Sequence, residues 1–242
     1  MPAPTVVDDD TSPWARIQRW RTSAALMTAA AIGTALLVLL VAVLVQWPRL
    51  QSLDTSGHVR FVTVTTHAQW LIRPARVLSA LGVASVIVLI CLVVAIDQWR
   101  RHRPAIAVWL LGTLLSGWLL TQCLKAMGDR QRPPTNGLYW EAGGPSWPSG
   151  HASVGIYGYG ALALLAWWTL RGRARGWVTG LLVALGVCIG LSRLVLLVHW
   201  PSDVVSGWLV GLLTLLVTGS LLAAWVRRHP QPRHAATTTP EP

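Results

Sequence analysis

The stretch SRLVLLVHWPSD, residues 192–203, decides how the rest of the fold is interpreted. It places an arginine, a histidine and an aspartate at the end of an apolar run that reads as a transmembrane helix, where an ionisable residue is a functional-site hypothesis by default. His199 and Asp203 supply the parts of an activated nucleophile or base, because a carboxylate on one ring nitrogen fixes the tautomer and supports a positive imidazole. Arg193 adds a cation for an anionic substrate.

The composition indicates an integral membrane protein. Of the 242 residues, 53% are hydrophobic and only 12% are charged, and the mean hydropathy is +0.49. The net charge is +11, and the arginines fall in small clusters at the ends of apolar runs. This pattern sets the orientation of a membrane protein and argues against a nucleic-acid partner. The cysteines lie inside apolar runs without metal-ligand spacing, so we expect packing or lipid-facing roles for Cys91, Cys123 and Cys188.

The apolar runs predict an all-α, polytopic protein with six transmembrane helices in a bundle. Each run is close to the roughly 20 residues that cross a bilayer. The predicted spans are about 23–46, 77–96, 105–124, 151–170, 177–198 and 204–226. The predicted organisation is a cytoplasmic tail, a six-span domain with an active-site loop, and a second cytoplasmic tail: 1–22, 23–226 with the loop at 125–150, and 227–242.

Residues 47–76 are too polar to span and too apolar for free solvent, so they predict an interfacial loop or helix. His58 and His67 in this segment have no partner at a telling spacing, and we interpret them as ordinary surface residues. Glycines four residues apart predict close helix packing within one bundle rather than dimerisation. These pairs are Gly176 and Gly180, Gly186 and Gly190, and Gly207 and Gly211.

The arginine distribution predicts the orientation. The two tails and the loops after the second and fourth spans carry 12 basic residues, and the opposite side carries eight. By the positive-inside rule the first set is cytoplasmic, so residues 125–150 and His199 face outward.

Two further clusters lie on the same predicted side as His199. Lys125 is the only lysine of the chain, which indicates that its position needs a compact ammonium rather than positive charge alone. Lys125 and Arg132 would share a helix face if the helix continued, although Gly128 and Pro133 favour its ending.

The second cluster is PSGH at 148–151, where the fourth predicted span begins. Unpaired backbone N–H groups at a helix start, with a glycine that lets a ligand approach, form an anion site. The alternative is a Ser149 cap with a nearby interfacial His151.

Taken together, the clusters predict one tetrahedral dianion such as phosphate, held by Lys125, Arg132, Arg193 and donors near Gly150. Two histidines then divide the chemistry, one attacking phosphorus and the other protonating the leaving oxygen. The acidic residues are scattered, so we predict no metal site.

The motifs at 125–133, 148–151 and 192–203 resemble the signature motifs of the type 2 phosphatidic acid phosphatase superfamily, which also contains vanadium-dependent haloperoxidases. Every defining position matches. The resemblance implies that His199 is the nucleophile that forms a phosphohistidine, that Asp203 orients it and that His151 is the general acid. It also implies a reaction without metal or cofactor, in which the phosphoryl oxygens are held by Lys125, Arg132, Ser149, Gly150 and Arg193.

The expected function is hydrolysis of a lipid phosphate at the outer leaflet of a bacterial cytoplasmic membrane. Phosphatidic acid, phosphatidylglycerol phosphate and polyprenyl diphosphate all present a phosphate at that depth, and we favour the polyprenyl carrier. Two alternatives stay open: a phosphotransferase that uses the same site with another lipid as acceptor, and an anionic-lipid transporter. The oligomeric state is not predicted.

Overall fold

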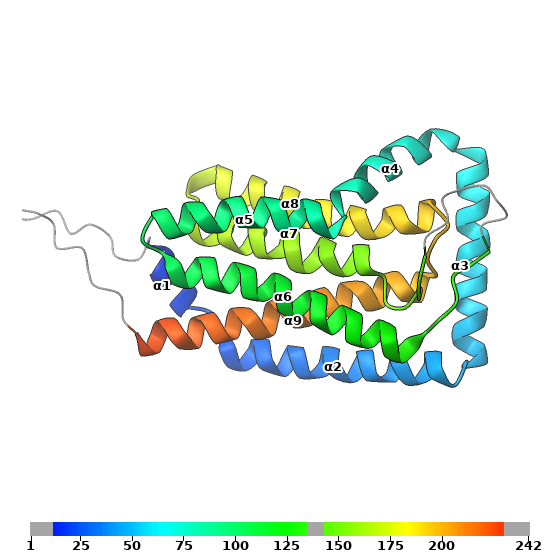
Figure 1. Ribbon diagram of the computed structural model, residues 1–242, viewed down its shortest axis with the longest axis horizontal. Helices are drawn as coiled ribbons and strands as arrows, with labels where there is room; N and C mark the ends of the chain where they lie inside the picture. Colours follow the sequence, from blue (N-terminus) through cyan, green and yellow to red (C-terminus); the bar gives the residue numbers. More distant parts are fainter. Residues whose placement is uncertain (1–11, 135–142, 230–242) are drawn as a thin grey trace, which may run out of the picture.

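The computed structural model describes residues 12–134 and 143–229, and all regular structure within them is helical, as predicted (Figure 1). The elements are α1 (Pro13–Gln18), α2 (Thr22–Leu44), α3 (Pro48–His67), a 3₁₀ turn η2 (Gln69–Leu71), α4 (Ile72–Leu81), α5 (Ala84–Arg100), α6 (Pro104–Gly128), α7 (Gly150–Thr169), α8 (Gly172–Val195) and α9 (Pro201–Arg228).

Among the described residues, four helices are long and apolar enough to cross a membrane: α2, α6, α8 and α9. A fifth span results if α4 and α5, which meet at a bend of 51°, are counted as one broken helix. The predicted count of six is therefore not confirmed. The difference lies in α7, which is 20 residues long but rich in glycine and aromatic residues. Because 13 of its residues are buried by neighbouring helices, α7 needs little lipid-compatible surface.

The centre of the bundle is built on close contacts between α7, α8 and α9. A Cβ added to Gly155 would lie 2.5 Å from the carbonyl oxygen of Gly186, so the backbones of α7 and α8 touch. Gly207 lies similarly close to the carbonyl of Ser149. Close packing is thus confirmed for the later glycine pairs. It is wrong for Gly176 and Gly180, where no described atom lies within 4 Å of an added Cβ.

The second predicted span, 77–96, is interrupted. Gly82 and Val83 separate α4 from α5, and the bend carries α4 away from the axis of α5 (Figure 1). Gly82 packs against the Ile189 side chain, and a Cβ there would also lie 3.1 Å from Cδ2 of His151. The break therefore occurs where helices meet too closely for a side chain.

The interfacial segment contains a helix, α3, that lies across one end of the bundle, opposite the end that holds α1 (Figure 1). We call these the α3 end and the α1 end. The buried residues of α3 are Leu50, Asp54, His58 and Thr65, whereas most of its other residues face outward. The surface interpretation of His58 is wrong, since its ring is buried 5.4 Å from that of Trp200. His67 is exposed.

The predicted tail 1–22 is partly structured. Ile17 of α1 is fully buried, and Arg16 donates to the carbonyl of Leu170 at 2.7 Å, at the end of α7. This one buried apolar side chain anchors α1 to the bundle. Residues 1–11 of the first tail and 230–242 of the second lie outside the described residues.

Candidate active site

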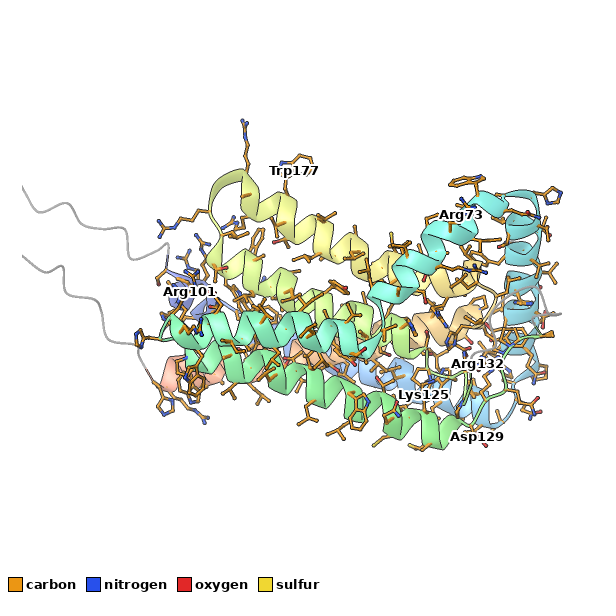
Figure 2. All side chains as sticks on the ribbon, turned by 45° about the horizontal axis from the view of Figure 1, so that its top comes forward. Arg73, Arg101, Lys125, Asp129, Arg132 and Trp177 are labelled. Atoms are coloured by element: carbon orange, nitrogen blue, oxygen red, sulfur yellow. The ribbon has the colours of Figure 1, made fainter. Side chains whose placement is uncertain are left out.

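The three motifs meet at the α3 end. Figure 2 labels Lys125 and Arg132 there, with Arg101 at the α1 end. Lys125 lies in the last turn of α6, and the helix ends at Gly128, so Arg132 belongs to the following loop. The remaining residues lie at the start of α7, the end of α8 and the start of α9: Ser149, Gly150 and His151; Arg193; His199 and Asp203.

His199 and Asp203 form the centre of this cluster. Nδ1 of His199 lies 3.3 Å from Oδ2 of Asp203, which also accepts the backbone N–H of Trp200 at 2.9 Å. Helix α9 begins at Pro201, so His199 lies outside it and the contact comes from a turn. Both side chains are almost inaccessible to solvent, with 3% and 0% of their surface exposed.

Arg132 and Asp203 together fix the tautomer of the His199 ring. Its Nη1 lies 3.1 Å from Nε2 of His199 and donates to the carbonyl of Val198 at 2.8 Å. Arginine can only donate, so Nε2 is the acceptor and the ring proton lies on Nδ1, facing Asp203. Burial lowers the pKa of His199 to about 4, with Arg132 and Arg193 lowering it further and Asp203 opposing them. The ring is therefore neutral near pH 7, with a lone pair on Nε2.

The other cations surround the same space. Nζ of Lys125 donates to the carbonyl of Pro145 at 2.6 Å, and Nη1 of Arg193 donates to the Ser79 hydroxyl of α4. Nε of Arg193 is buried without a hydrogen-bond partner among the described residues. His151 interacts electrostatically with Lys125, Arg132, Arg193 and His199. A buried, unsatisfied donor beside several cations suits an anionic ligand.

Ser149 connects two motifs through its backbone. Its N–H donates to the carbonyl of Asp203 at 2.9 Å, and its side chain accepts from the N–H of Ala152 as the N-cap of α7. An added Cβ at Gly150 would lie 3.7 Å from Cε of Lys125. The start of α7 and its unpaired N–H groups therefore lie beside the lysine.

A charge network that the sequence did not reveal holds the far side of Asp203. Nη1 of Arg130 donates to Oδ1 of Asp203 at 2.9 Å, and Nη2 donates to Oδ2 of Asp54 at 2.7 Å. Asp54 accepts from both the N–H and the hydroxyl of Ser202, at 2.9 and 2.6 Å. The guanidinium also lies 5.4 Å from the ring centre of Trp200. Asp54 is 2% exposed, so α3 contributes a buried carboxylate to the site.

The position of Asp54 could have been recognised in the sequence. Asp54 is the only acidic residue of α3, and it lies on the same helix face as Leu50 and His58. Within residues 12–134 and 143–229, no three His, Cys, Asp or Glu side chains converge on a common point as metal ligands.

Fold and site together define a polytopic helical membrane protein with a buried histidine–aspartate pair among cations at one end of its bundle. The chain belongs to the PAP2 superfamily, whose family model matches residues 106–227. This region contains all three motifs.

A solved structure shares the fold. The crystal structure of a transmembrane PAP2-type phosphatidylglycerolphosphate phosphatase from Bacillus subtilis matches with a TM-score of 0.72 at 21% sequence identity, covering 85% of this chain and 98% of that one.

Curated relatives match over shorter stretches. An undecaprenyl-diphosphatase of Sulfolobus acidocaldarius is 42% identical over 66 residues, which are 27% of this chain and 28% of the relative. The putative undecaprenyl-diphosphatase YbjG of Escherichia coli is 42% identical over 71 residues, or 29% and 32%. The chain thus matches less than a third of the length of each of these relatives.

Proposed function

We propose that the protein is a membrane lipid phosphatase that hydrolyses a phosphomonoester or diphosphate of a lipid through His199. The observation that carries the proposal is the environment of this ring: Nδ1 faces Asp203, and Nε2 faces Arg132. The Nε2 lone pair of this neutral imidazole is held by Arg132, and it can attack an anionic phosphorus centre once the phosphate oxygens replace Nε2 as the acceptor of the guanidinium.

The proposed reaction has two steps. Nε2 of His199 forms a bond to phosphorus as the bond to the lipid oxygen breaks, and His151 protonates the leaving oxygen. A water molecule, deprotonated by His151, then attacks the phosphohistidine, which releases phosphate and restores both histidines. Asp203 stabilises the positive imidazole of the intermediate. Charge on the transferred group is stabilised by the N–H groups that begin α7 and by Lys125, Arg132 and Arg193, with Ser149 and Gly150 shaping the helix start.

Arg130 and Asp54 serve as positioning residues in this proposal. Asp203 can rotate about two side-chain bonds, and its contact with His199 requires one orientation. Arg130 holds Oδ1 while the Trp200 N–H holds Oδ2, and Asp54 fixes Arg130 in turn. The interfacial helix α3 thereby supports the nucleophile indirectly.

The proposed location is a bacterial cytoplasmic membrane, with the α3 end outward and the α1 end in the cytoplasm. The arginine clusters support this orientation. Counting α7 and the bent α4–α5 pair as spans gives six. Phosphatidic acid, phosphatidylglycerol phosphate and polyprenyl diphosphate are the candidate substrates. The names of the curated relatives favour an undecaprenyl diphosphate, whereas that of the solved structure favours phosphatidylglycerol phosphate.

The test is phosphate release by the detergent-solubilised protein from these three lipids, with a chelator present. We expect His199→Ala to lower turnover by several orders of magnitude, as removal of a nucleophile does. His67→Ala on the exposed face of α3 is the matched control and should behave as the wild type. Release that survives His199→Ala would refute the mechanism. If the folded wild-type protein releases no phosphate from any of the three lipids, phosphate transfer to an acceptor lipid or lipid transport would replace hydrolysis as the proposed function.

A further inference from the structure

The α1 end of the bundle contains a groove of about 800 Å³, remote from the candidate active site. It is lined by α1, the link 19–21 between α1 and α2, and helices α7, α8 and α9. We infer that this groove binds one anionic phospholipid, with an acyl chain between the helices and the phosphate among arginines. The inference concerns a second site and does not depend on the proposed catalytic function.

The groove exists because α8 and α9 separate toward the α1 end. All buried residues of α8 lie from Gly186 onward, and at Gly176 and Gly180 the space around the backbone is open. In Figure 1 the two helices lie on opposite sides of α7 at this end. Arg175, Thr179 and Val183 follow one another at intervals of four residues and line the groove along one face of α8.

The interior of the groove matches an acyl chain. Its apolar lining includes Gly160, Ala163 and Leu164 of α7, Val183 of α8, and Leu212 and Leu216 of α9. Val183 and Leu212 remain 48% and 42% exposed. These helices are candidate membrane spans, so the exposed apolar side chains face lipid and a chain can enter sideways from the bilayer.

The rim of the groove matches an anionic headgroup. Arg16, Arg19, Arg21 and Arg175 all line it, and none of the described lining residues is acidic. Arg16 donates hydrogen bonds to the carbonyl oxygens at the end of α7, so its role is to hold α1 at the rim of the groove. The Arg175 guanidinium stacks 4.0 Å from the ring centre of Trp167, which occupies its flat face and leaves its N–H edge for a phosphate.

A rim that carries arginines and no acidic residue among the described lining residues favours a lipid with net negative charge over a zwitterionic one. Basic pockets between membrane helices on the cytoplasmic side recognise acidic headgroups in this way. Phosphatidylglycerol should therefore bind in preference to phosphatidylethanolamine, although the two share the same chains and phosphate.

The test is native mass spectrometry of the full-length protein in mild detergent with equal amounts of these two lipids. We expect roughly tenfold more bound phosphatidylglycerol than phosphatidylethanolamine on the wild type. The triple variant Arg19→Gln, Arg21→Gln, Arg175→Gln should lose this preference. The control removes three charges outside the groove at the same end, Arg100→Gln, Arg103→Gln and Arg228→Gln, and should keep it.

A second variant separates the cavity from its charges. Thr179→Trp places a large side chain in the groove and leaves every arginine in place, so it should expel both lipids if the chain binds between the helices. The inference is overturned if the wild type shows no headgroup preference. It is also overturned if the control triple variant loses the preference as fully as the groove variant, or if Thr179→Trp binds lipid as the wild type does.

Discussion

We predict that kcat/KM depends on pH through the protonation of the His199 ring. Its pKa of about 4 lies below the ordinary value of 6.5 because the ring is buried, so the neutral nucleophile persists as the pH falls from 7 toward 5. We expect the acid limb of kcat/KM to have its midpoint near pH 4. Because the phosphate of a substrate also titrates, the limb should be measured with a monoester and a diphosphate. A common midpoint at pH 6 to 7 would contradict the assignment.

We predict that substitution of Arg130 or Asp54 lowers turnover without weakening substrate binding. Arg130→Gln frees Oδ1 of Asp203, and a small displacement of the reacting groups can cost up to about 100-fold in rate. We expect kcat to fall by about 10- to 100-fold with KM little changed, and Asp54→Asn to act in the same direction. The double variant should be less than additive, since both residues act through one contact.

The pH profile of the Arg130→Gln variant distinguishes a positioning role for Arg130 from a purely structural one. Without the guanidinium, Asp203 supports the imidazolium more strongly, so the pKa of His199 should rise and the acid limb should move to higher pH. Asp97→Asn is the matched control, because it breaks an exposed ion pair with Arg101 at the other end of the protein. An unmoved acid limb, or an equal effect of Asp97→Asn, would refute the positioning role.

The sequence motifs predicted which residues come together, because each motif lies where one predicted span ends or the next begins. The partners of these residues could not be predicted. Asp54 and Arg130 are separated by 76 positions, and their contact depends on how α3 lies across the bundle. Ser79, which holds Arg193, lies 114 positions away.

Helix packing predicts opposite outcomes for two glycine-to-alanine changes. In Gly155→Ala the new methyl group meets the Gly186 carbonyl at 2.5 Å, so α7 and α8 must separate. We expect a clear drop in the unfolding temperature in detergent. Gly180→Ala meets no described atom within 4 Å and removes a flexible residue from a helix, which stabilises by up to about 1 kcal/mol. Equal unfolding temperatures for the two variants would contradict the described contact.

The lengths of the apolar runs predicted most helices but treated α4 and α5 as one continuous span. Apolar residues run on through Gly82 and Val83 without an interruption in hydropathy, and a lone glycine inside a helix is usually tolerated. The break follows from contacts with Ile189 and His151, which belong to helices far along the chain. The burial of α7 likewise depends on which helices pack against it, and its hydropathy does not show this.

We predict that the α3 end faces outward and the α1 end faces the cytoplasm, and cysteine labelling can test this topology. Gln69 begins the η2 turn that joins α3 to α4 at the α3 end (Figure 1). His102 follows Arg101, which Figure 2 labels at the α1 end, in the link between α5 and α6. In a variant without native cysteines, Gln69→Cys should react with a membrane-impermeant maleimide in intact cells. His102→Cys should react only after the cells are opened. The reverse pattern would place the candidate active site in the cytoplasm.

The meeting of Lys125, Arg132 and Arg193 at one place has a consequence for the stability of the protein. Three positive groups from separate parts of the chain repel one another when nothing lies between them, and an oxyanion would link α6, the following loop and α8. Phosphate should therefore protect the protein against heat as well as inhibit it, with an unfolding temperature that rises with phosphate concentration. Such an enzyme would resist unfolding best when its phosphate product is abundant and its turnover is slow.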